Sequence, residues 1–264
     1  MIADLVGTTA VLTGAGSGIG RASASAFAGA GAHVVVSDVD GMRAESVAAE
    51  IVASGGSAVG VRCDVRKDDD FVALRAAALD SSGRVDIVMN NVGVLALGPP
   101  TAIPVPVWQE ILDINVLSIV RSNATFLDGL VDQGSGHIVN TASTAGLFAY
   151  GFERLPYSAS KGAVVALTEA LALYAIPRGV GVTCLCPGPV ATNIAEQVRV
   201  YGDIGNMRGP ELPLLDPAVV GDQVVKAVRT GTYFLPTHPE VSGILERRAK
   251  DPDGFLLERI GRLP

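Results

Sequence analysis

Short runs of apolar and β-branched residues alternate with longer stretches of helical periodicity along most of the chain. Six runs have the length and composition of strands: Thr8–Thr13, His33–Ser37, Ala58–Cys63, Asp86–Asn90, His137–Thr141 and Gly181–Cys186. The stretches between them carry apolar residues at helical spacing: Ile19–Ala30, Met42–Ser54, Asp68–Ser82, Val107–Val131 and Tyr157–Ile176. This alternation predicts an α/β fold in which a doubly wound, mainly parallel sheet has helices on both faces.

The pattern becomes irregular beyond Cys186, where residues 187–217 contain five prolines and four glycines. Long irregular segments in a compact domain are usually functional or disordered. Within this one, four apolar residues at spacings of four, three and three predict an amphipathic helix: Ile194, Val198, Tyr201 and Ile204. Such a helix either packs on its own domain or closes over a largely apolar substrate.

The C-terminal end adds a helix (218–230), a short strand (232–235) and a helical tail to the expected elements. No linker, repeat or low-complexity segment interrupts the pattern before or after them. We therefore expect a single domain over residues 1–264.

The chain is apolar in composition, with 48% hydrophobic residues and a mean hydropathy of +0.39. A parallel sheet covered on both faces accounts for this, because its strands are apolar on both sides. The most apolar long run, Gly162–Ile176, contains Glu169 and is shorter than the roughly 20 residues of a spanning helix. We therefore expect no membrane segment.

Charge and cysteine content narrow the expected partners and location. The chain has 20 Lys and Arg against 27 Asp and Glu, a net charge of −7 without a basic cluster, so nucleic acid is not an expected partner. The N-terminus lacks the features of a signal peptide, and three cysteines suit a reducing compartment, which predicts a cytoplasmic protein. Cys184 and Cys186 are expected on one packed face, and without nearby His or acidic residues they predict no metal site.

A glycine-rich turn, Thr13–Gly20, lies between the first strand and the first helix. Its glycines fall at alternate positions, Gly14, Gly16, Gly18 and Gly20, and not at the spacing G-x-G-x-x-G. Glycines let the backbone approach a pyrophosphate, and the N–H groups and dipole at a helix N-terminus favour that anion. The turn alone is a weak sign of nucleotide binding, but its place between strand and helix strengthens it.

Asp38 closes the second strand, 18 residues after Gly20. An acidic side chain there accepts hydrogen bonds from ribose hydroxyls and repels a 2′-phosphate, which favours NAD over NADP. No Arg or Lys lies inside the glycine turn, and Val39 follows Asp38, so no partner for a phosphate is evident. The alternative interpretation is a solvated carboxylate at a strand end.

Tyr157 and Lys161 are four residues apart in the fifth long helix, so the phenol and the ammonium can face one site. A neighbouring ammonium and a positive nicotinamide both favour the phenolate and bring the pKa of Tyr157 down from about 10. Ser143 ends the fifth strand, at the sheet edge where ligands bind, and its hydroxyl can polarise a carbonyl while Tyr157 donates the proton. Together with the nucleotide turn, these residues predict hydride transfer between a cofactor and a secondary alcohol or ketone.

In their order along the chain, the motifs resemble those of the short-chain dehydrogenase/reductase family over residues 5 to about 235. They are Thr13–Gly20, Cys63-Asp-Val65, Asn90-Asn-Val-Gly93, Asn115, Ser143, Tyr157 with Lys161, and Pro187-Gly-Pro-Val-Ala-Thr192. The resemblance implies a Rossmann-type sheet of seven strands and a catalytic tetrad of Asn115, Ser143, Tyr157 and Lys161. With the glycine turn, it implies these cofactor contacts: Gly14, Ser17, Gly18, Ile19, Gly20, Asp38, Asp64, Val65, Asn91, Gly93, Tyr157, Lys161, Pro187, Gly188, Val190 and Thr192.

Several individual roles follow from the resemblance alone. It implies that Lys161 also holds the ribose hydroxyls, that Asn115 supports a water in a proton relay, and that Asp64 contacts adenine. Val190 and Thr192 are implied to hold the carboxamide of the cofactor. One position departs from the family: the segment between residues 90 and 93 has Val where Ala is usual, which a small repacking beside the cofactor would absorb.

The resemblance places a substrate lid at about residues 191–215. Four apolar residues flank the expected catalytic centre and predict an apolar wall: Leu95, Leu147, Phe148 and Phe152. Arg199 and Arg208 offer the alternative of recognising a carboxylate, although charges on such segments are usually solvated. The substrate class stays open at this point.

Two other functions stay open beside an NAD-dependent dehydrogenase. An NADP-dependent ketoreductase for acyl or polyketide-like substrates would carry a basic docking patch, and Asp38 and the net charge argue against it. A nucleotide-sensing regulator would be expected to lose Ser143, Tyr157 or Lys161, and all three are present. Finally, the apolar surface of the helices at 107–131 and 157–176, with the resemblance, predicts a homodimer or homotetramer.

Overall fold

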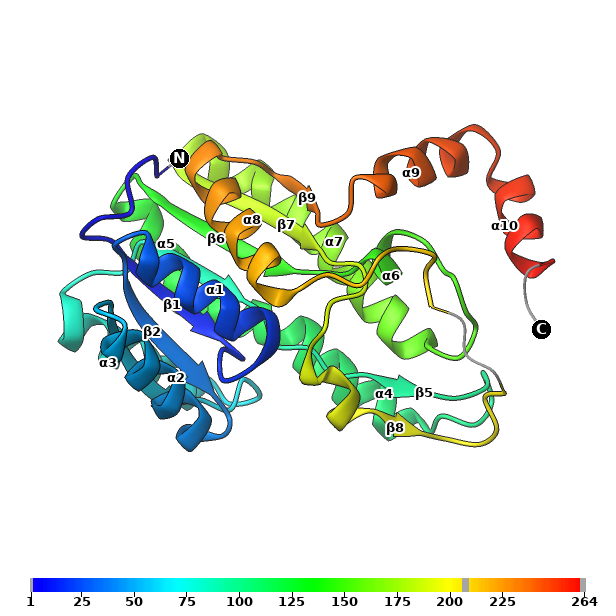
Figure 1. Ribbon diagram of the computed structural model, residues 1–264, viewed down its shortest axis with the longest axis horizontal. Helices are drawn as coiled ribbons and strands as arrows, with labels where there is room; N and C mark the ends of the chain where they lie inside the picture. The colour runs from blue at the N-terminus through cyan, green and yellow to red at the C-terminus, as the bar shows by residue number, and fades with distance from the viewer. Residues whose placement is uncertain (1, 206–208, 262–264) are drawn as a thin grey trace.

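A seven-stranded parallel sheet forms the centre of the protein, as seen in the computed structural model, which describes residues 2–205 and 209–261 (Figure 1). The strand order is β3-β2-β1-β4-β6-β7-β9, and every neighbouring pair is parallel. The strands are β1 (Thr9–Thr13), β2 (His33–Asp38), β3 (Ser57–Arg62), β4 (Ile87–Asn90), β6 (Gly136–Thr141), β7 (Val180–Cys186) and β9 (Phe234–Pro236). The order reverses between β1 and β4, and ligands bind at such a switch point, outside the carboxyl ends of the strands.

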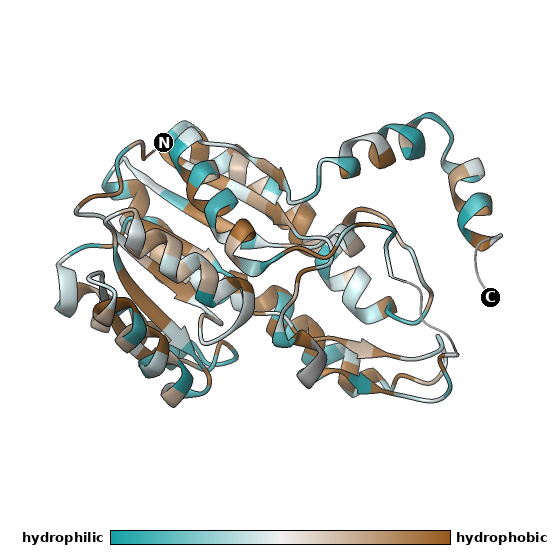
Figure 2. Ribbon diagram, in the orientation of Figure 1, coloured by the Kyte–Doolittle hydropathy of each residue, from teal (hydrophilic) through white to brown (hydrophobic). Residues whose placement is uncertain are grey.

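Three helices cover each face of the sheet, so the predicted doubly wound fold is confirmed. One face packs against α1 (Gly18–Gly29), α2 (Gly41–Ala53) and α8 (Pro217–Thr230). The other packs against α3 (Asp68–Ser82), α5 (Ser118–Asp132) and α7 (Leu155–Ala175). Figure 2 shows the strands between these layers coloured mainly as hydrophobic, as expected of strands that are buried on both sides.

The helix predicted at 107–131 is divided into three parts. They are α4 (Val105–Leu112), a π-helical turn (Asp113–Leu117) and α5. Asn115 lies in the π turn and is buried, and its side chain bonds to the backbone of Val94 in both directions. Periodicity did not predict the interruption, because apolar residues continue at helical spacing across it.

The segment predicted as an amphipathic helix is not one. It contains a 3₁₀ turn (Asn193–Gln197) and the short strand β8 (Arg199–Val200), which pairs with β5 (Ala96–Leu97). Tyr201 packs against a small cluster formed with residues of α4, so strand pairing and packing with distant residues override the local helical spacing. Of the segment 191–215, residues 206–208 lie outside the described structure, and Arg208 with them.

The predicted helical tail is confirmed as α9 (Glu240–Lys250) and α10 (Pro252–Ile260), which extend away from the sheet (Figure 1). The tail contacts the short helix α6 (Thr144–Leu147) and the residue after it, because Phe255 lies edge-on to Phe148 with ring centroids 6.4 Å apart. The tail therefore reaches the side of the molecule that follows Ser143.

By length and composition, one stretch among the described residues, Leu155–Arg178, could cross a membrane. The helix is longer than the apolar run Gly162–Ile176, because it begins earlier than that run does. Its buried residues, among them Leu171 and Ala175, pack with residues of β6 and β7 in the sheet core. One face of this helix is therefore part of the sheet core.

Candidate active site

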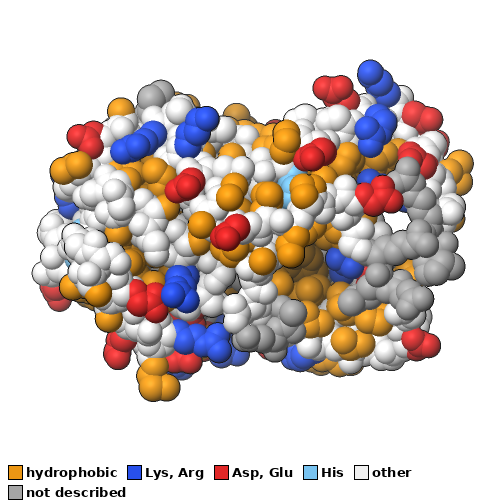
Figure 3. All heavy atoms as spheres, in the orientation of Figure 1, with side chains coloured by type: hydrophobic (Ala, Val, Ile, Leu, Met, Phe, Trp, Pro, Cys, Tyr) orange, Lys and Arg blue, Asp and Glu red, His pale blue; other side chains and the backbone are white. Residues whose placement is uncertain are grey.

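A cleft of about 590 Å³ lies at the carboxyl ends of the central strands. Figure 3 shows the molecule hollowed beside the sheet, with hydrophobic side chains deep in the hollow. The cleft wall includes most of the residues predicted for the site: Gly14, Ser17, Gly18, Ile19, Asp38, Asp64, Val65, Asn91, Gly93, Ser143, Tyr157, Lys161, Pro187, Gly188, Val190 and Thr192. Gly20 and Asn115 are not on the wall, and their contacts give the reasons.

The glycine turn is built from conformations and close approaches that only glycine allows. Gly14 and Gly18 have φ of 62° and 53°, in the left-handed region. A Cβ at Gly20 would overlap the carbonyl oxygen of Gly14, so Gly20 serves the close packing of α1 on the turn instead of touching a ligand. The departure from the family, Val92, fits because its Cγ2 lies 2.9 Å from the place where Gly14 would carry a Cβ.

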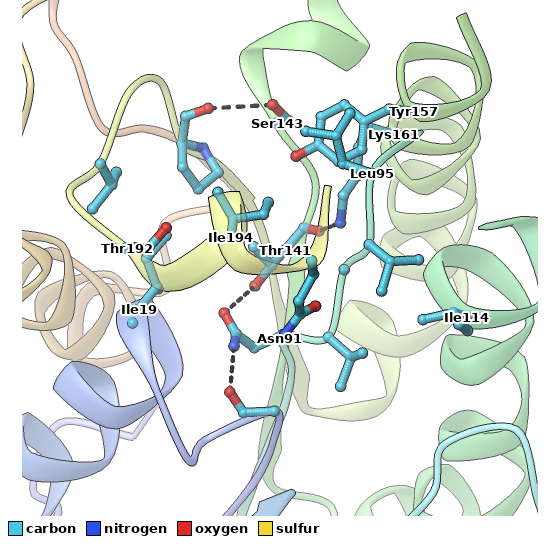
Figure 4. A pocket seen from close by; sticks show the side chains of 18 of the residues that line it. Ile19, Asn91, Leu95, Ile114, Thr141, Ser143, Tyr157, Lys161, Thr192 and Ile194 are labelled. Atoms are coloured by element: carbon cyan, nitrogen blue, oxygen red, sulfur yellow. Dashed lines mark hydrogen bonds between the residues drawn. The ribbon is translucent and has the colours of Figure 1, made fainter. Parts of the chain in front are cut away.

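The turn presents the N-terminus of α1 to the cleft. The first N–H groups of a helix have no partner inside it, and the dipole makes this end attractive to anions. Ser17 precedes the helix and makes no capping hydrogen bond with its hydroxyl. Asn91 fixes the turn by donating from Nδ2 to the Gly14 carbonyl at 3.0 Å, as Figure 4 shows. The arrangement can therefore hold a pyrophosphate.

Asp38 lies at the end of β2 and also fixes the turn. Its carboxylate accepts hydrogen bonds from the N–H groups of Gly16 and Asp40, both at 3.1 Å. The structure adds a cation that sequence reasoning missed: the Cβ of Arg43 lies 2.8 Å from where Gly16 would carry one. Arg43 comes here because α2 begins only three residues after Asp38, and its guanidinium pairs with Asp40 at 3.5 Å.

Asp64 follows β3 and is held by a neighbouring cation. Arg66 donates to its two carboxylate oxygens at 2.8 and 2.7 Å, and the Arg66 N–H donates as well. The hydrogen bonds from Arg66 lower the pKa of Asp64 to about 2, so this group is a carboxylate at neutral pH. Asp64 and Val65 thus form the wall of the cleft on the side of Asp38.

Lys161 lies on α7 and projects into the cleft with little exposure to solvent. Its Nζ donates to the Thr141 carbonyl at 2.7 Å and lies 5.9 Å from the centroid of the Tyr157 ring. Burial lowers the pKa of Lys161 to about 8. Its ammonium also lies beside Gly93, where a Cβ would be 3.1 Å from Nζ. In Figure 4, Lys161 and Tyr157 come together with Ser143 at one end of the pocket.

Tyr157 lies on the same face of α7, and its surroundings differ from the expectation in one respect. In the protein alone, burial raises the pKa of Tyr157 to about 12, and a hydrogen bond with Ser143 lowers it by less. The expected lowering by nearby charge is therefore outweighed by loss of hydration. Ser143 is itself fixed, because its Oγ accepts from the Ala145 N–H at 3.1 Å and donates to the Pro187 carbonyl at 3.5 Å.

Asn115 supports the site from behind the wall. Its Oδ1 accepts from the Val94 N–H at 2.8 Å, and its Nδ2 donates to the Val94 carbonyl at 3.0 Å and to Ser160 Oγ at 2.9 Å. Because Ser160 precedes Lys161, this side chain connects the π turn to the part of α7 that carries the reactive residues. Its amide groups are thus occupied by protein contacts, and the side chain itself does not reach the cleft.

The part of the cleft beside the glycine turn, Asp38 and Asp64 is called the nucleotide end. The segment after β7 closes its far side. Gly188 donates its N–H to Thr237 Oγ1 at 3.1 Å, and Val190 forms a bridge with Leu215. The Cβ of Thr192 lies 3.1 Å from where Gly18 would carry a Cβ, so this segment touches the start of α1. The structure therefore brings two parts of the chain, 174 residues apart in sequence at their closest approach, to one end of the cleft.

The part of the cleft beyond Tyr157 and Ser143 is called the substrate end. Only part of the predicted apolar wall is present there. Leu95 lines the cleft, and Ile114 and Ile194 line it with Leu95. Leu147 and Phe148 are buried in a separate cluster that includes residues of the C-terminal tail, and Phe152 is 44% exposed. These three residues were therefore wrongly predicted as wall, because sequence proximity to the centre does not decide which side a residue packs on.

Polar residues complete the substrate end. Tyr150 and Arg154 line it, and neither was predicted, although Arg154 precedes Tyr157 by a spacing of three residues. Arg199 is not on the wall and pairs with Glu110 of α4 at 2.8 Å, so the suggested role in recognising a carboxylate is not supported by its position. Cys184 and Cys186 are buried in the core as expected, with Sγ atoms 3.7 Å apart.

Comparison with known proteins agrees with this arrangement. Residues 8–200 match the sequence profile of the family described as short chain dehydrogenase, which covers more than half of the chain. The chain belongs to the short-chain dehydrogenase/reductase family. As a member of this family, the protein is an oxidoreductase that acts on CH–OH or keto groups.

Members of the family with different substrates resemble this short-chain dehydrogenase/reductase to a similar degree. Cyclohexanol dehydrogenase of Acinetobacter sp. is 33% identical over 76% of this chain and 82% of its own. A 3-oxoacyl-[acyl-carrier-protein] reductase of Synechocystis sp. is 33% identical over 74% of this chain and 79% of its own. A short-chain dehydrogenase/reductase from Burkholderia phymatum, solved in complex with NAD, has a TM-score of 0.85 and 32% identity over 95% of each chain.

Proposed function

We propose that this short-chain dehydrogenase/reductase uses NAD to interconvert a secondary alcohol and its ketone. The observation that carries the proposal is the meeting of Tyr157, Lys161 and Ser143 with the glycine turn in one cleft. Hydride transfer with proton exchange needs two components. One is a turn that binds a dinucleotide, and the other is a phenol beside an ammonium. Each comes from a different half of the chain.

The residues at the nucleotide end fit a dinucleotide. A Cβ at Gly14 would meet Val92 at 2.9 Å and one at Gly18 would meet Thr192 at 3.1 Å, so only glycine lets these two cleft residues pack against the turn. When bound, the cofactor accepts or supplies the hydride. We assign pyrophosphate binding to the α1 N-terminus, ribose binding to Asp38 and Lys161, and the adenine end to Asp64 and Val65. The remaining proposed contacts are Ser17, Ile19, Asn91, Gly93, Pro187, Gly188, Val190 and Thr192, and Gly20 supports the turn by its packing.

The proton is exchanged by Tyr157 in this proposal. In alcohol oxidation the phenolate of Tyr157 takes the proton of the substrate hydroxyl, and in ketone reduction the phenol returns it. Lys161 supplies a positive charge beside that oxygen, and Ser143 donates a hydrogen bond to the substrate oxygen. Asn115 positions α7 through Ser160, and any part it takes in a water relay would use its backbone and not its side chain.

Asp38 supports NAD over NADP, because its carboxylate lines the cleft at the end of β2, where in this proposal it would bind the adenosine ribose and repel a 2′-phosphate. An NADP-dependent ketoreductase is the second candidate, and two observations favour it. Arg43 lies beside Asp38, and relatives include a protein named as an oxoacyl reductase. A regulator without chemistry is less well supported, because Ser143, Tyr157 and Lys161 are together in the cleft.

We infer that the substrate is largely apolar and that residues 191–215 act as its lid. Leu95 and Ile194 line the cleft with apolar side chains. The names of two relatives are consistent with a cyclic substrate: one is a cyclohexanol dehydrogenase, and one is a 7α-hydroxysteroid dehydrogenase solved with NADH and a bile-acid derivative, with a TM-score of 0.78. That structure is 26% identical over 88% of this chain and 93% of its own.

We further propose a cytoplasmic homodimer or homotetramer that binds neither membrane nor nucleic acid. Apolar side chains on two neighbouring helices support assembly: Val120 on α5 is 48% exposed and Leu173 on α7 is 78% exposed. The three free, buried cysteines suit a reducing compartment. Light scattering at micromolar concentration tests the assembly, and a monomer would contradict it.

The function is tested by measuring NADH formation with a panel of secondary alcohols: cyclic, steroid, polyol and open-chain. We expect activity that prefers apolar cyclic alcohols and uses NAD better than NADP. Activity only with NADPH and β-ketoacyl thioesters would replace the first proposal by the second. Cofactor binding without turnover of either the secondary alcohols or the β-ketoacyl thioesters would support a regulator.

A further inference from the structure

Arg154 lies at the substrate end of the cleft, immediately before α7 and three residues before Tyr157. It lines the same cleft as Tyr157, and its side chain is 13% exposed. Arg154 is the N-cap residue of α7 and Tyr157 lies in its first turn, so two residues that line the cleft come from one short segment. A cation with so little hydration requires partners, because burying an unpaired charge is costly.

Two side chains hold the guanidinium. Glu153, whose side chain is 4% exposed, accepts a hydrogen bond from Nε of Arg154 at 2.9 Å and another from Nη2. The Tyr150 ring lies against the guanidinium, with Cζ 4.5 Å from the ring centroid. Glu153 is fixed in turn, since its carbonyl accepts the Gly98 N–H at 2.7 Å and its carboxylate lies against Gly151. The position of the positive charge is therefore well defined.

We propose that Arg154 is a positioning residue that places a positive charge beside Tyr157 and eases the loss of its proton, and that Glu153 limits the size of this effect. The inference rests on the proposed function, in which the Tyr157 phenolate takes the proton of the substrate hydroxyl. The pair would thereby set the pH at which alcohol oxidation becomes efficient. Neither residue touches the reacting atoms in this proposal.

The ionisable groups around Tyr157 come from several elements. Lys161 lies one turn further along α7, Ser143 precedes α6, and Tyr150 and Arg154 come from the loop that leads into α7. Burial is the largest cause of the raised pKa of Tyr157, and Tyr150 raises it further; Ser143 and Arg154 lower it. Arg154 therefore acts against burial from the residue that precedes the helix.

Substitutions at the two charges should have opposite effects, which makes the proposal testable. Oxidation requires the Tyr157 phenolate, so kcat/KM for the best alcohol rises with pH through the pKa of Tyr157. Arg154→Gln leaves the Glu153 charge unbalanced and should move this rise to higher pH by about one pH unit. Glu153→Gln should move it to lower pH, and the double variant should fall between the two single variants. Arg154→Lys keeps the charge and should stay close to the wild type.

A second measurement does not depend on turnover. Ultraviolet absorbance of tyrosinate, taken as the difference between each protein and the same protein with Tyr157→Phe, reports ionisation of Tyr157 directly. It should move in the same directions as the kinetic profile. The double variant buries no unpaired charge, so it keeps the test valid where Arg154→Gln lowers the stability of the loop.

The outcomes separate this inference from the proposed function. Unmoved profiles, or profiles that move in the same direction in Arg154→Gln and Glu153→Gln, would show a purely structural pair and overturn the inference. If turnover survives in Tyr157→Phe while the absorbance titrations move as expected, the proposed function fails and the effect of Arg154 stands. If Tyr157→Phe abolishes turnover and neither profile moves, only the inference about Arg154 fails.

Discussion

The two ends of the cleft are held together in different ways. At the nucleotide end, side chains bond to main-chain groups: Asp38 accepts the Gly16 N–H, and Asn91 donates to the Gly14 carbonyl. Near the substrate end, pairs of side chains make contacts: Arg199 of β8 with Glu110 of α4, and Arg154 with Glu153. The glycine turn is therefore held through main-chain atoms, whereas Arg154 and Arg199 are held by other side chains.

The difference suggests how one scaffold serves several substrates. Contacts to main-chain atoms persist whatever the neighbouring side chains are, so the nucleotide end can remain unchanged while the substrate end varies. Two relatives with the same overall identity to this chain, 33%, are named for a cyclic alcohol and for an oxoacyl group. Substitutions at each end should then affect different constants.

Tyr157, where the two ends meet, should give the largest effect. Tyr157→Phe removes the proton-transferring oxygen and little volume, so turnover should fall by roughly 10²–10⁴-fold, while NADH affinity stays within about twofold of the wild type. Steady-state rates and fluorescence titration of NADH measure the two quantities. Near-normal turnover would remove Tyr157 from the mechanism, and a large loss of NADH affinity would mean that the two ends are not separable.

Gly20→Ala tests the tight packing at the nucleotide end. The added methyl overlaps the Gly14 carbonyl, and overpacking of this kind costs about 1–3 kcal/mol of folding stability. NADH affinity should fall by about tenfold, because the turn must shift to make room. The control is Gly29→Ala in the same helix, where a Cβ meets no atom within 4 Å. Equal melting temperatures and NADH affinities for both variants would refute the packing argument.

Asp38→Ser tests the choice of cofactor. Loss of the carboxylate removes a ribose partner and a charge that repels a 2′-phosphate, so the preference for NADH over NADPH should shrink by about tenfold, or about 1.4 kcal/mol. Arg43 should assist NADPH in this variant, and adding Arg43→Ala should reverse part of the gain. Asp40→Ser is the control, since serine can also cap α2. Tighter binding of NADPH than NADH by the wild type would overturn the NAD assignment.

Arg199→Ala should give the smallest effect and tests how loosely the substrate end is held. Both partners of this ion pair are partly exposed, so its loss should cost less than about 1 kcal/mol of folding stability and raise KM for the alcohol by no more than about fivefold. NADH affinity should be unchanged. Arg21→Ala, which breaks the exposed pair with Glu50 between α1 and α2, is the matched control and should leave KM unchanged.

The two ends also differed in how far the sequence could predict them. The glycine turn and Asp38 can be recognised from their places beside predicted strands, and both line the cleft, although their contacts with Asn91 and Gly16 join residues that are distant in sequence. Arg43 was missed because its approach to the turn depends on the residue at which α2 begins. The same holds for Arg154, whose partners Glu153 and Tyr150 are near in sequence but whose place in the cleft depends on the start of α7.

The wrong predictions lie where distant pairing decides the structure. The helical spacing from Ile194 onwards is real, yet β8 pairs with β5 and Tyr201 joins the cluster around Ile103, so the segment cannot form a helix. Phe148 was expected in the cleft, but the C-terminal tail supplies Phe255 as its neighbour. Periodicity describes one segment at a time and contains no information on such partners.

The π-helical turn between α4 and α5 fixes the phase of one helix relative to the other. An α-helix advances 100° per residue, so a turn that holds one residue more than usual rotates everything after it by about that angle. Deleting one residue from Asp113–Leu117 would restore an uninterrupted α-helix. Either Asn115 would then turn away from Val94, or Phe126 and Leu130 would rotate out of the sheet core. The extra residue thus lets a single long helix satisfy two angular requirements, one toward the cleft and one toward the sheet.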